Sequence, residues 1–138
     1  MEKLKLNFLH LCDAASVDNL GKISILGIFS RVFLPKVPSK FLKFTVVGNV
    51  SFIKTEKNPT KIQIKIFDAN KKELQLASPL FVEFSMPANA TKNEGDVNFI
   101  FDIGNLDFKT FGKYSLIIYV DGKDIESKSF IVEERKTN

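Results

Sequence analysis

Hydrophobic and polar residues alternate with a period of two along most of the chain, and each alternating run ends at Gly, Pro, Asn or Asp. This is the pattern of half-buried antiparallel β-strands, whose successive side chains point to opposite faces of a sheet. About eight runs can be counted: 4–14, 23–34, 42–52, 62–66, 74–84, 97–103, 114–120 and 125–132. The pattern therefore predicts an all-β chain, folded as an antiparallel sandwich of two sheets.

Two of these runs give more detailed predictions. In the first run, one face carries Leu4, Leu6, Phe8, His10 and Cys12. The run 23–34 is apolar on both faces, so we expect a central strand that is covered on each side, with a β-bulge at Gly27. The segment 35–38, Pro-Lys-Val-Pro, lacks two backbone donors, and we expect the chain to cross there from one sheet to the other.

Turn residues divide the runs. Residues 18–22, which include Gly21, connect the first two runs as a hairpin, and Asp121-Gly122 favours the positive φ values of a tight hairpin turn. Residues 85–96 form the longest polar stretch and predict an exposed loop. The sequence indicates one domain over residues 1–132 and a flexible tail over 133–138.

The strongest local motif is Leu106-x-Phe108-x-x-x-Gly112-x-Tyr114, directly before a strand in the last third of the chain. It resembles the tyrosine corner of immunoglobulin-like sandwiches, in which a Tyr hydroxyl bonds back to upstream backbone and Gly permits the turn. The motif favours an immunoglobulin-like type of sandwich.

The segment 14–29, which combines the acidic-glycine turn at 18–22 with Gly27-x-Phe29, resembles the opening of a family of small bacterial β-sandwich proteins of unknown function. The Gly112-x-Tyr114 corner and the Asp121-Gly122 turn fit the same family. The resemblance implies a fold and supplies no catalytic residues.

Composition and charge narrow the possible functions. With 138 residues, the chain has the length of one ordinary domain, and its net charge of +4 is spread along the sequence. The single cysteine, Cys12, excludes an internal disulfide and fits a reducing compartment, so we expect a cytoplasmic protein. Charged and polar residues interrupt the apolar start of the chain, which argues against a signal peptide, and no stretch has the length of a membrane span.

The sequence offers no catalytic or metal site. The only histidine, His10, and Cys12 lie about 7 Å apart along one strand, too far for ready proton transfer, and one Cys and one His are too few for zinc. Six aspartates could suit calcium at loop ends, but turn formation explains them as well: Asp13, Asp18, Asp96, Asp102, Asp121 and Asp124. No pair of carboxylates suggests a glycosidase, and phosphate-binding glycine loops are missing. We therefore expect no enzyme activity and no cofactor.

Binding remains as the predicted function. Ile100, Ile117 and Tyr119 stand where a solvent-facing sheet would carry polar residues, so we predict a noncatalytic protein-binding module whose partner is another protein or a second copy of the chain. The loop residues Met86, Asn89 and Lys92 are a second candidate contact. The alternatives are a sandwich that binds a metal or a sugar and, with less support, a nucleic-acid-binding sheet built on Phe67 and Phe81 with Lys61, Gln63 and Lys65.

Overall fold

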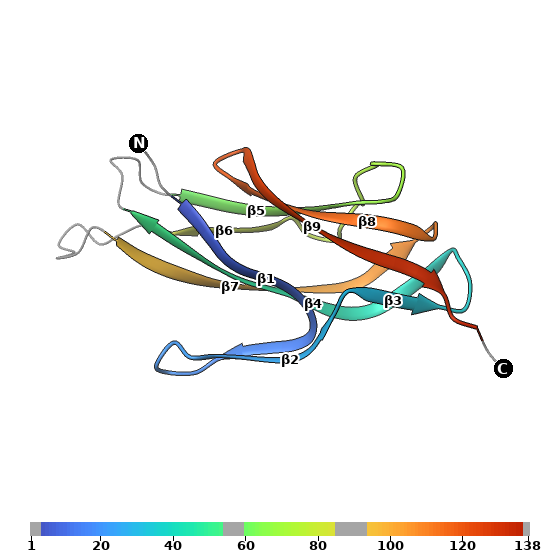
Figure 1. Ribbon diagram of the computed structural model, residues 1–138, viewed down its shortest axis with the longest axis horizontal. Coiled ribbons are helices and arrows are strands. Elements are labelled where there is room, and N and C mark those ends of the chain that lie inside the picture. The colour runs from blue at the N-terminus through green and yellow to red at the C-terminus, as the bar shows by residue number, and fades with distance from the viewer. Residues whose placement is uncertain (1–3, 54–59, 85–93, 137–138) are drawn as a thin grey trace.

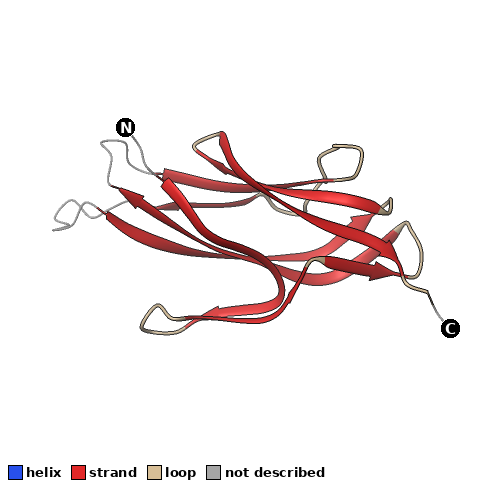
Figure 2. Cartoon of the chain, in the orientation of Figure 1, coloured by secondary structure: helices blue, strands red, loops and turns tan. Residues whose placement is uncertain are grey.

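The computed structural model describes residues 4–53, 60–84 and 94–136, and its regular elements there are β-strands (Figures 1 and 2). The strands are β1 (Leu4–Val17), β2 (Ile23–Phe29), β3 (Arg31–Leu34), β4 (Ser39–Ile53), β5 (Thr60–Phe67), β6 (Leu80–Phe84), β7 (Glu94–Phe108), β8 (Gly112–Val120) and β9 (Lys123–Glu134). They form a four-stranded sheet, β2-β1-β4-β7, and a five-stranded sheet, β3-β9-β8-β5-β6. The all-β, two-sheet prediction is confirmed, with nine strands in the described residues instead of about eight.

The core lies between the two sheets and is built from the apolar positions of the alternating runs. In β5, Ile62, Ile64 and Ile66 have almost no exposed surface, while the residues between them are partly buried on the other face. Around Tyr114, the rings of Phe108 and Phe130 lie with centroids 5.3 and 5.4 Å from the tyrosine ring. Burial of these side chains supplies the main stabilisation, because each fully buried aliphatic or aromatic side chain contributes about 1.5–3 kcal/mol.

The run 23–34 is not one central strand, and this prediction is wrong. The chain leaves the four-stranded sheet after β2 and enters the five-stranded sheet as β3, with the carbonyl of Ser30 accepting from the Ile131 amide at 2.9 Å. Both strands are outermost in their sheets, and β3 pairs with β9 in parallel, so the sandwich is not wholly antiparallel. The predicted crossing at 35–38 is confirmed, because it returns the chain from β3 to β4 in the other sheet. In the segment 23–34, the apolar residues on both faces therefore belong to a chain that passes from one sheet to the other.

The β-bulge predicted at Gly27 is absent, since the pairing of β1 with β2 keeps one register on both sides of it. Gly27 instead has a φ of 69°, and a Cβ atom there would lie 2.3 Å from Oδ2 of Asp13. A β-bulge does occur in β1, between Leu6 and Phe8, where the pairing with β4 shifts by one residue. Gly27 therefore has a backbone conformation that favours glycine, and it lies close to the side chain of Asp13.

The bulge in β1 changes which residues face the core. Leu6, Leu9 and Leu11 pack in or against the core cluster. Phe8 and the residues that alternate with it, His10 and Cys12, lie on the outer face of the sheet, opposite Asn49, Val47 and Thr45 of β4. The predicted single face from Leu4 to Cys12 is therefore wrong, because one extra residue reverses the side to which later side chains point.

The β1–β2 hairpin folds back beneath the four-stranded sheet in the view of Figure 1. Its turn contacts this sheet, because the side-chain amide of Asn98 in β7 donates to the carbonyl of Gly21 at 3.3 Å. Val47, on the outer face of the central strand β4, has no exposed surface. The central part of the outer face of the four-stranded sheet, around Val47, is thus covered by the chain itself.

The predicted tight turns are confirmed. Asp121 and Gly122 have φ values of 50° and 86° and connect β8 directly to β9. At the turn of residues 18–22, the Asp18 carboxylate accepts from the amides of Leu20 and Lys22, both at 2.9 Å. The same arrangement recurs at residues 68–72, where the Asp68 carboxylate accepts two amides. Both aspartates therefore act in turns.

The tyrosine corner is present at the start of β8. The hydroxyl of Tyr114 donates to the backbone carbonyl of Thr110, four residues upstream, at 2.8 Å. Gly112 has a φ of 135°, and a Cβ atom there would lie 2.8 Å from Cβ of Ala69. The glycine and the tyrosine therefore have the structural roles that the sequence motif predicted.

Several strand boundaries differ from the sequence prediction: β7, for example, begins at Glu94, inside the segment 85–96 that was predicted to be a loop. The predicted strand 74–84 is regular only from Leu80 onward, because residues 75–79 leave the sheet after a single bridge between Phe67 and Glu73. β9 continues to Glu134, where Glu133 and Glu134 pair with β3. Strand β9 thus extends two residues into the predicted tail.

Candidate functional site

The outer face of the five-stranded sheet carries aromatic, aliphatic and basic side chains close together. They project outward because they alternate with the buried core residues of β5, β6 and β8. We call this surface the Tyr119 face, and it consists of Lys61, Gln63, Lys65, Phe81, Ile117 and Tyr119. It brings together residues from three strands that are far apart in sequence.

Strand register fixes the arrangement of this face. Gln63 in β5 lies directly between Phe81 in β6 and Tyr119 in β8. Neighbouring strands are about 4.8 Å apart, so the two aromatic residues stand about 10 Å apart on either side of the amide. Phe81 is 44% exposed, and Tyr119 and Ile117 are partly buried. The face therefore presents two rings with a hydrogen-bonding amide between them.

Two lysines lie over these rings. Nζ of Lys61 is 4.6 Å from the ring centroid of Phe81, and Nζ of Lys65 is 5.4 Å from that of Tyr119. Each contact is a cation–π interaction worth about 0.5–1 kcal/mol at an exposed site. The lysine stems also cover apolar surface, so the face combines hydrophobic contact area with positive charge.

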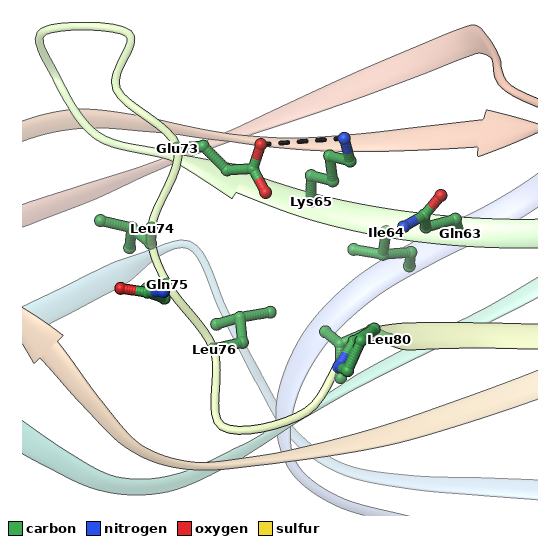
Figure 3. Close-up of a pocket in the computed structure, with 9 residues that line it drawn as sticks. Gln63, Ile64, Lys65, Glu73, Leu74, Gln75, Leu76 and Leu80 are labelled. Carbon is green, nitrogen blue, oxygen red and sulfur yellow. Dashed lines mark ion pairs between the residues drawn. The ribbon is translucent and has the colours of Figure 1, made fainter.

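A notch adjoins the Tyr119 face where residues 75–79 leave the sheet (Figure 3). Its walls include the apolar side chains of Leu74, Leu76 and Leu80. At its rim, Nζ of Lys65 lies 3.7 Å from Oε1 of Glu73, as the dashed line in Figure 3 marks. The notch offers a partly apolar recess that shares Gln63 and Lys65 with the Tyr119 face.

The structure places the predicted contact residues on two different surfaces. Ile117 and Tyr119 lie on the Tyr119 face, but Ile100 is in β7, on the outer face of the four-stranded sheet, opposite Val47. The prediction of one shared face for Ile100, Ile117 and Tyr119 is therefore wrong, because β7 and β8 belong to different sheets. Met86, Asn89 and Lys92 lie outside the described residues.

The Tyr119 face also contains most of the residues that the sequence assigned to a nucleic-acid alternative. Phe81, Lys61, Gln63 and Lys65 adjoin Ile117 and Tyr119, whereas Phe67 lies at the end of β5, opposite Ser115. In the sequence these residues belong to two separate predicted sites, because alternation shows which face a side chain is on and does not show which strands are neighbours.

His10 and Cys12 do not form a reactive pair. Burial raises the pKa of the Cys12 thiol, and burial together with the positive charge of Lys128 lowers the pKa of His10. The thiol donates to the carbonyl of Ala14 at 3.4 Å. These surroundings favour a neutral thiol rather than a nucleophilic thiolate.

The aspartates considered for calcium are dispersed. In the described ranges, no three His, Cys, Asp or Glu side chains are grouped so that they could hold a metal ion. Asp102 accepts from the hydroxyl of Thr45 at 2.7 Å, and Asp96 accepts from the amide of Asn49 at 3.0 Å. Hydrogen bonds across the four-stranded sheet account for these two carboxylates.

Comparison with known proteins places the chain in a family. The model of a family of unknown function (DUF6941) matches residues 7–133. The chain belongs to this family. A search of curated proteins found no match.

Solved structures share the DUF6941 fold at low identity. Crystal structures of β-glucosidase from Listeria innocua, with isofagomine and with glucose, match with TM-scores of 0.53 and 0.52 at 10% identity. Each match covers 96% of this chain and 16% of the glucosidase chain, so the chain has the size of one part of that enzyme. The alkylpurine DNA glycosylase AlkC from Pseudomonas fluorescens matches with a TM-score of 0.44 at 10% identity, over 94% of this chain and 30% of its own. The likeness to the glucosidase concerns the fold alone.

As for membranes, the part of the chain that the structure describes contains no helix that is long and apolar enough to span one.

Proposed function

We propose that this DUF6941 protein is a noncatalytic protein-binding module of the cytoplasm, with an immunoglobulin-like type of sandwich. Two features support the immunoglobulin-like type. The chain switches sheets at Ser30 and pairs β3 in parallel with the last strand, β9, and the Tyr114 hydroxyl forms the corner.

The observation that carries the binding proposal is the grouping of Phe81, Ile117 and Tyr119 on one sheet face. A sheet face that only meets water would carry polar residues at these positions. Aromatic residues are enriched among the side chains that dominate protein–protein binding energy, since they offer large contact area at a low entropic cost. The Tyr119 face has this composition.

The charges indicate which kind of surface the Tyr119 face binds. Lys61 and Lys65 stand over the rings, so a partner with an apolar centre and carboxylates around it is complementary. A nucleic acid is less complementary, because its binding to a sheet needs clustered basic residues, whereas Glu73 lies 3.7 Å from Lys65 and Glu83 stands opposite Lys61 in the strand register. The proposal therefore commits to an acidic protein surface.

We expect the double variant Ile117→Glu and Tyr119→Glu to weaken binding by about 30-fold or more, which corresponds to the loss of about 2 kcal/mol at a binding hot spot. The measurement is capture of partners from the source cell on immobilised protein, followed by titration of the captured partner. Thermal unfolding checks that the variant remains folded.

Ile100→Glu is the matched control, because Ile100 is also partly buried on an outer face but belongs to the other sheet. The proposal requires that this variant binds like the natural protein. Equal binding by all three proteins would contradict it, as would a double variant that unfolds, since those side chains would then belong to the core.

Capture of nucleic acid with a steep dependence on salt would favour the nucleic-acid alternative instead. A melting temperature raised by calcium, magnesium or a sugar would favour the ligand-binding alternative, since a ligand of the folded state stabilises it.

A further inference from the structure

The segment 23–34 runs along the outside of the sandwich as an open strand edge. β2 is the outermost strand of the four-stranded sheet, and β3 is the outermost strand of the five-stranded sheet (Figure 1). No described strand pairs with the outer side of β2. An open edge presents backbone donors and acceptors that another strand can bind.

Three large apolar side chains of this edge are exposed, while Ile23, Ile25 and Phe29 are partly buried. Leu26 is 69% exposed and Ile28 is 56% exposed, and Phe33 follows on β3 at 52%. The eight residues from Ile23 to Ser30 include no charged side chain. Natural edge strands commonly carry charges or prolines that prevent pairing with other chains, and β2 has neither.

The hydrogen bonds of the hairpin show which backbone groups of β2 point outward. The amide of Asp18 donates to the carbonyl of Lys22 at 3.0 Å, which makes these two residues a hydrogen-bonded pair. Such pairs recur at every second residue, so the next one along the register is Ser16 with Ser24. The N–H and C=O groups of Ile23, Ile25 and Phe29 therefore point away from β1, toward the open side.

We propose that two copies of this chain associate through antiparallel pairing of their β2 strands about a two-fold axis at Leu26. In this register, Ile25 faces Gly27 of the second copy, Ser24 faces Ile28, and Ile23 faces Phe29. The outward N–H and C=O groups of Ile23, Ile25 and Phe29 then form hydrogen bonds with the outward N–H and C=O groups of β2 in the second copy. The two four-stranded sheets become one continuous sheet.

The occupant is a second copy because the edge is complementary to itself. A two-fold axis requires that each residue i meets j while j meets i. Around Leu26, the large side chains of Ile25 and Ile28 meet the small residues Gly27 and Ser24. The edge strand β2 carries no charge, whereas the net charge of +4 on the whole chain makes two copies repel each other. The uncharged edge is therefore a surface at which this repulsion is small. Association here leaves the Tyr119 face, on the other sheet, free in both copies.

The first experiment measures solution mass by light scattering across a wide range of protein concentrations. The natural chain is expected to be a dimer at high concentration, and Leu26→Lys is expected to shift the equilibrium toward monomer at least tenfold. Leu20→Lys is the matched control, because Leu20 is 88% exposed at the hairpin turn and lies outside β2. A natural chain that stays monomeric, or a Leu26→Lys protein that still dimerises fully, overturns the proposal.

A second experiment tests the register and does not depend on Leu26→Lys being folded. In Leu26→Cys, the two introduced thiols face each other across the axis, so mild oxidation is expected to join the copies by a disulfide. In Ile28→Cys, the two thiols are separated by four residues, about 13 Å, and no disulfide is expected. Cys12 is fully buried and does not compete.

Equal cross-linking of both cysteine variants overturns the register. The outcome is independent of the proposed function, since Ile117→Glu with Tyr119→Glu should leave the dimer intact and Leu26→Lys should leave partner capture intact.

Discussion

Tyr114 connects local chain geometry to the core at the scale of a single residue. Its ring has no exposed surface and packs against Phe108 and Phe130, while its hydroxyl donates to the carbonyl of Thr110. The ring therefore contributes hydrophobic burial, and the hydroxyl satisfies a backbone acceptor at the loop that leads into β8. These two contributions can be separated by one substitution.

We expect Tyr114→Phe to lower the free energy of unfolding by about 1–3 kcal/mol, because the ring remains while the carbonyl of Thr110 loses its donor. Urea denaturation measures this change. Tyr119→Phe is the matched control, since Tyr119 lies on the outer sheet face, and a change below about 0.5 kcal/mol is expected there. Equal effects of the two substitutions would show that the Tyr114 hydrogen bond adds nothing to stability.

At the scale of an element, the β1–β2 hairpin depends on two glycines for different reasons. Gly21 has a φ of 80° in the turn, and no atom lies within 4 Å of a Cβ added there. Gly27 combines a φ of 69° with a Cβ position 2.3 Å from Oδ2 of Asp13. The first glycine is required by backbone conformation alone, and a side chain at the second would also have to displace the side chain of Asp13.

Gly27→Ala is therefore expected to destabilise the protein more than Gly21→Ala, for which left-handed strain alone costs about 1–2 kcal/mol. Thermal or urea unfolding measures both. The double variant Asp13→Ala with Gly27→Ala should lose only as much stability as Gly21→Ala, because the clash with Asp13 is removed and the cost of the positive φ remains. If the two alanine variants are equally stable, contact with Asp13 has no energetic role.

At the scale of the whole molecule, Lys128 joins the two sheets. It lies on β9, and its ammonium group donates to the carbonyl of Leu9 on β1 and lies 3.1 Å from Nδ1 of His10. Lysine carries no acceptor, so this contact requires an unprotonated Nδ1 on His10. The contact between Lys128 and His10 therefore requires a neutral His10, whereas the hydrogen bond to Leu9 does not.

The pKa of His10 is lowered in the folded state by burial and then by the charge of Lys128. The unfolded chain binds the proton more readily, so the stabilisation is present above the ordinary histidine pKa of about 6.5 and is lost as pH falls below it. We expect the free energy of unfolding to fall between about pH 7 and pH 5 more steeply for the natural chain than for His10→Gln. Parallel pH profiles of the two proteins would contradict this.

Local features of the fold could be predicted from the sequence, because they depend on residues close together in the chain. Asp121-Gly122 and residues 18–22 form turns through their own φ preferences and side-chain bonds, and the Tyr114 corner spans four residues. Alternation in β5 and β8 identified buried and outward positions correctly. Most strands and turns of the domain can therefore be predicted from short segments of the sequence.

The tertiary structure alone decided how these strands combine. A single bulge after Leu6 reversed the face of His10, and a switch at Ser30 turned an apparently central strand into two edges. Strand neighbours are chosen by contacts between distant segments, which period-two patterns do not encode. For this reason Ile100 lies on a different sheet from Tyr119. Phe81 and Tyr119 lie on the same sheet face, with Gln63 between them. In regular strands such as β5 and β8, the sequence determined which side chains face outward, whereas the bulge in β1 and the packing of the sheets decided the face of His10 and which outward side chains share a surface.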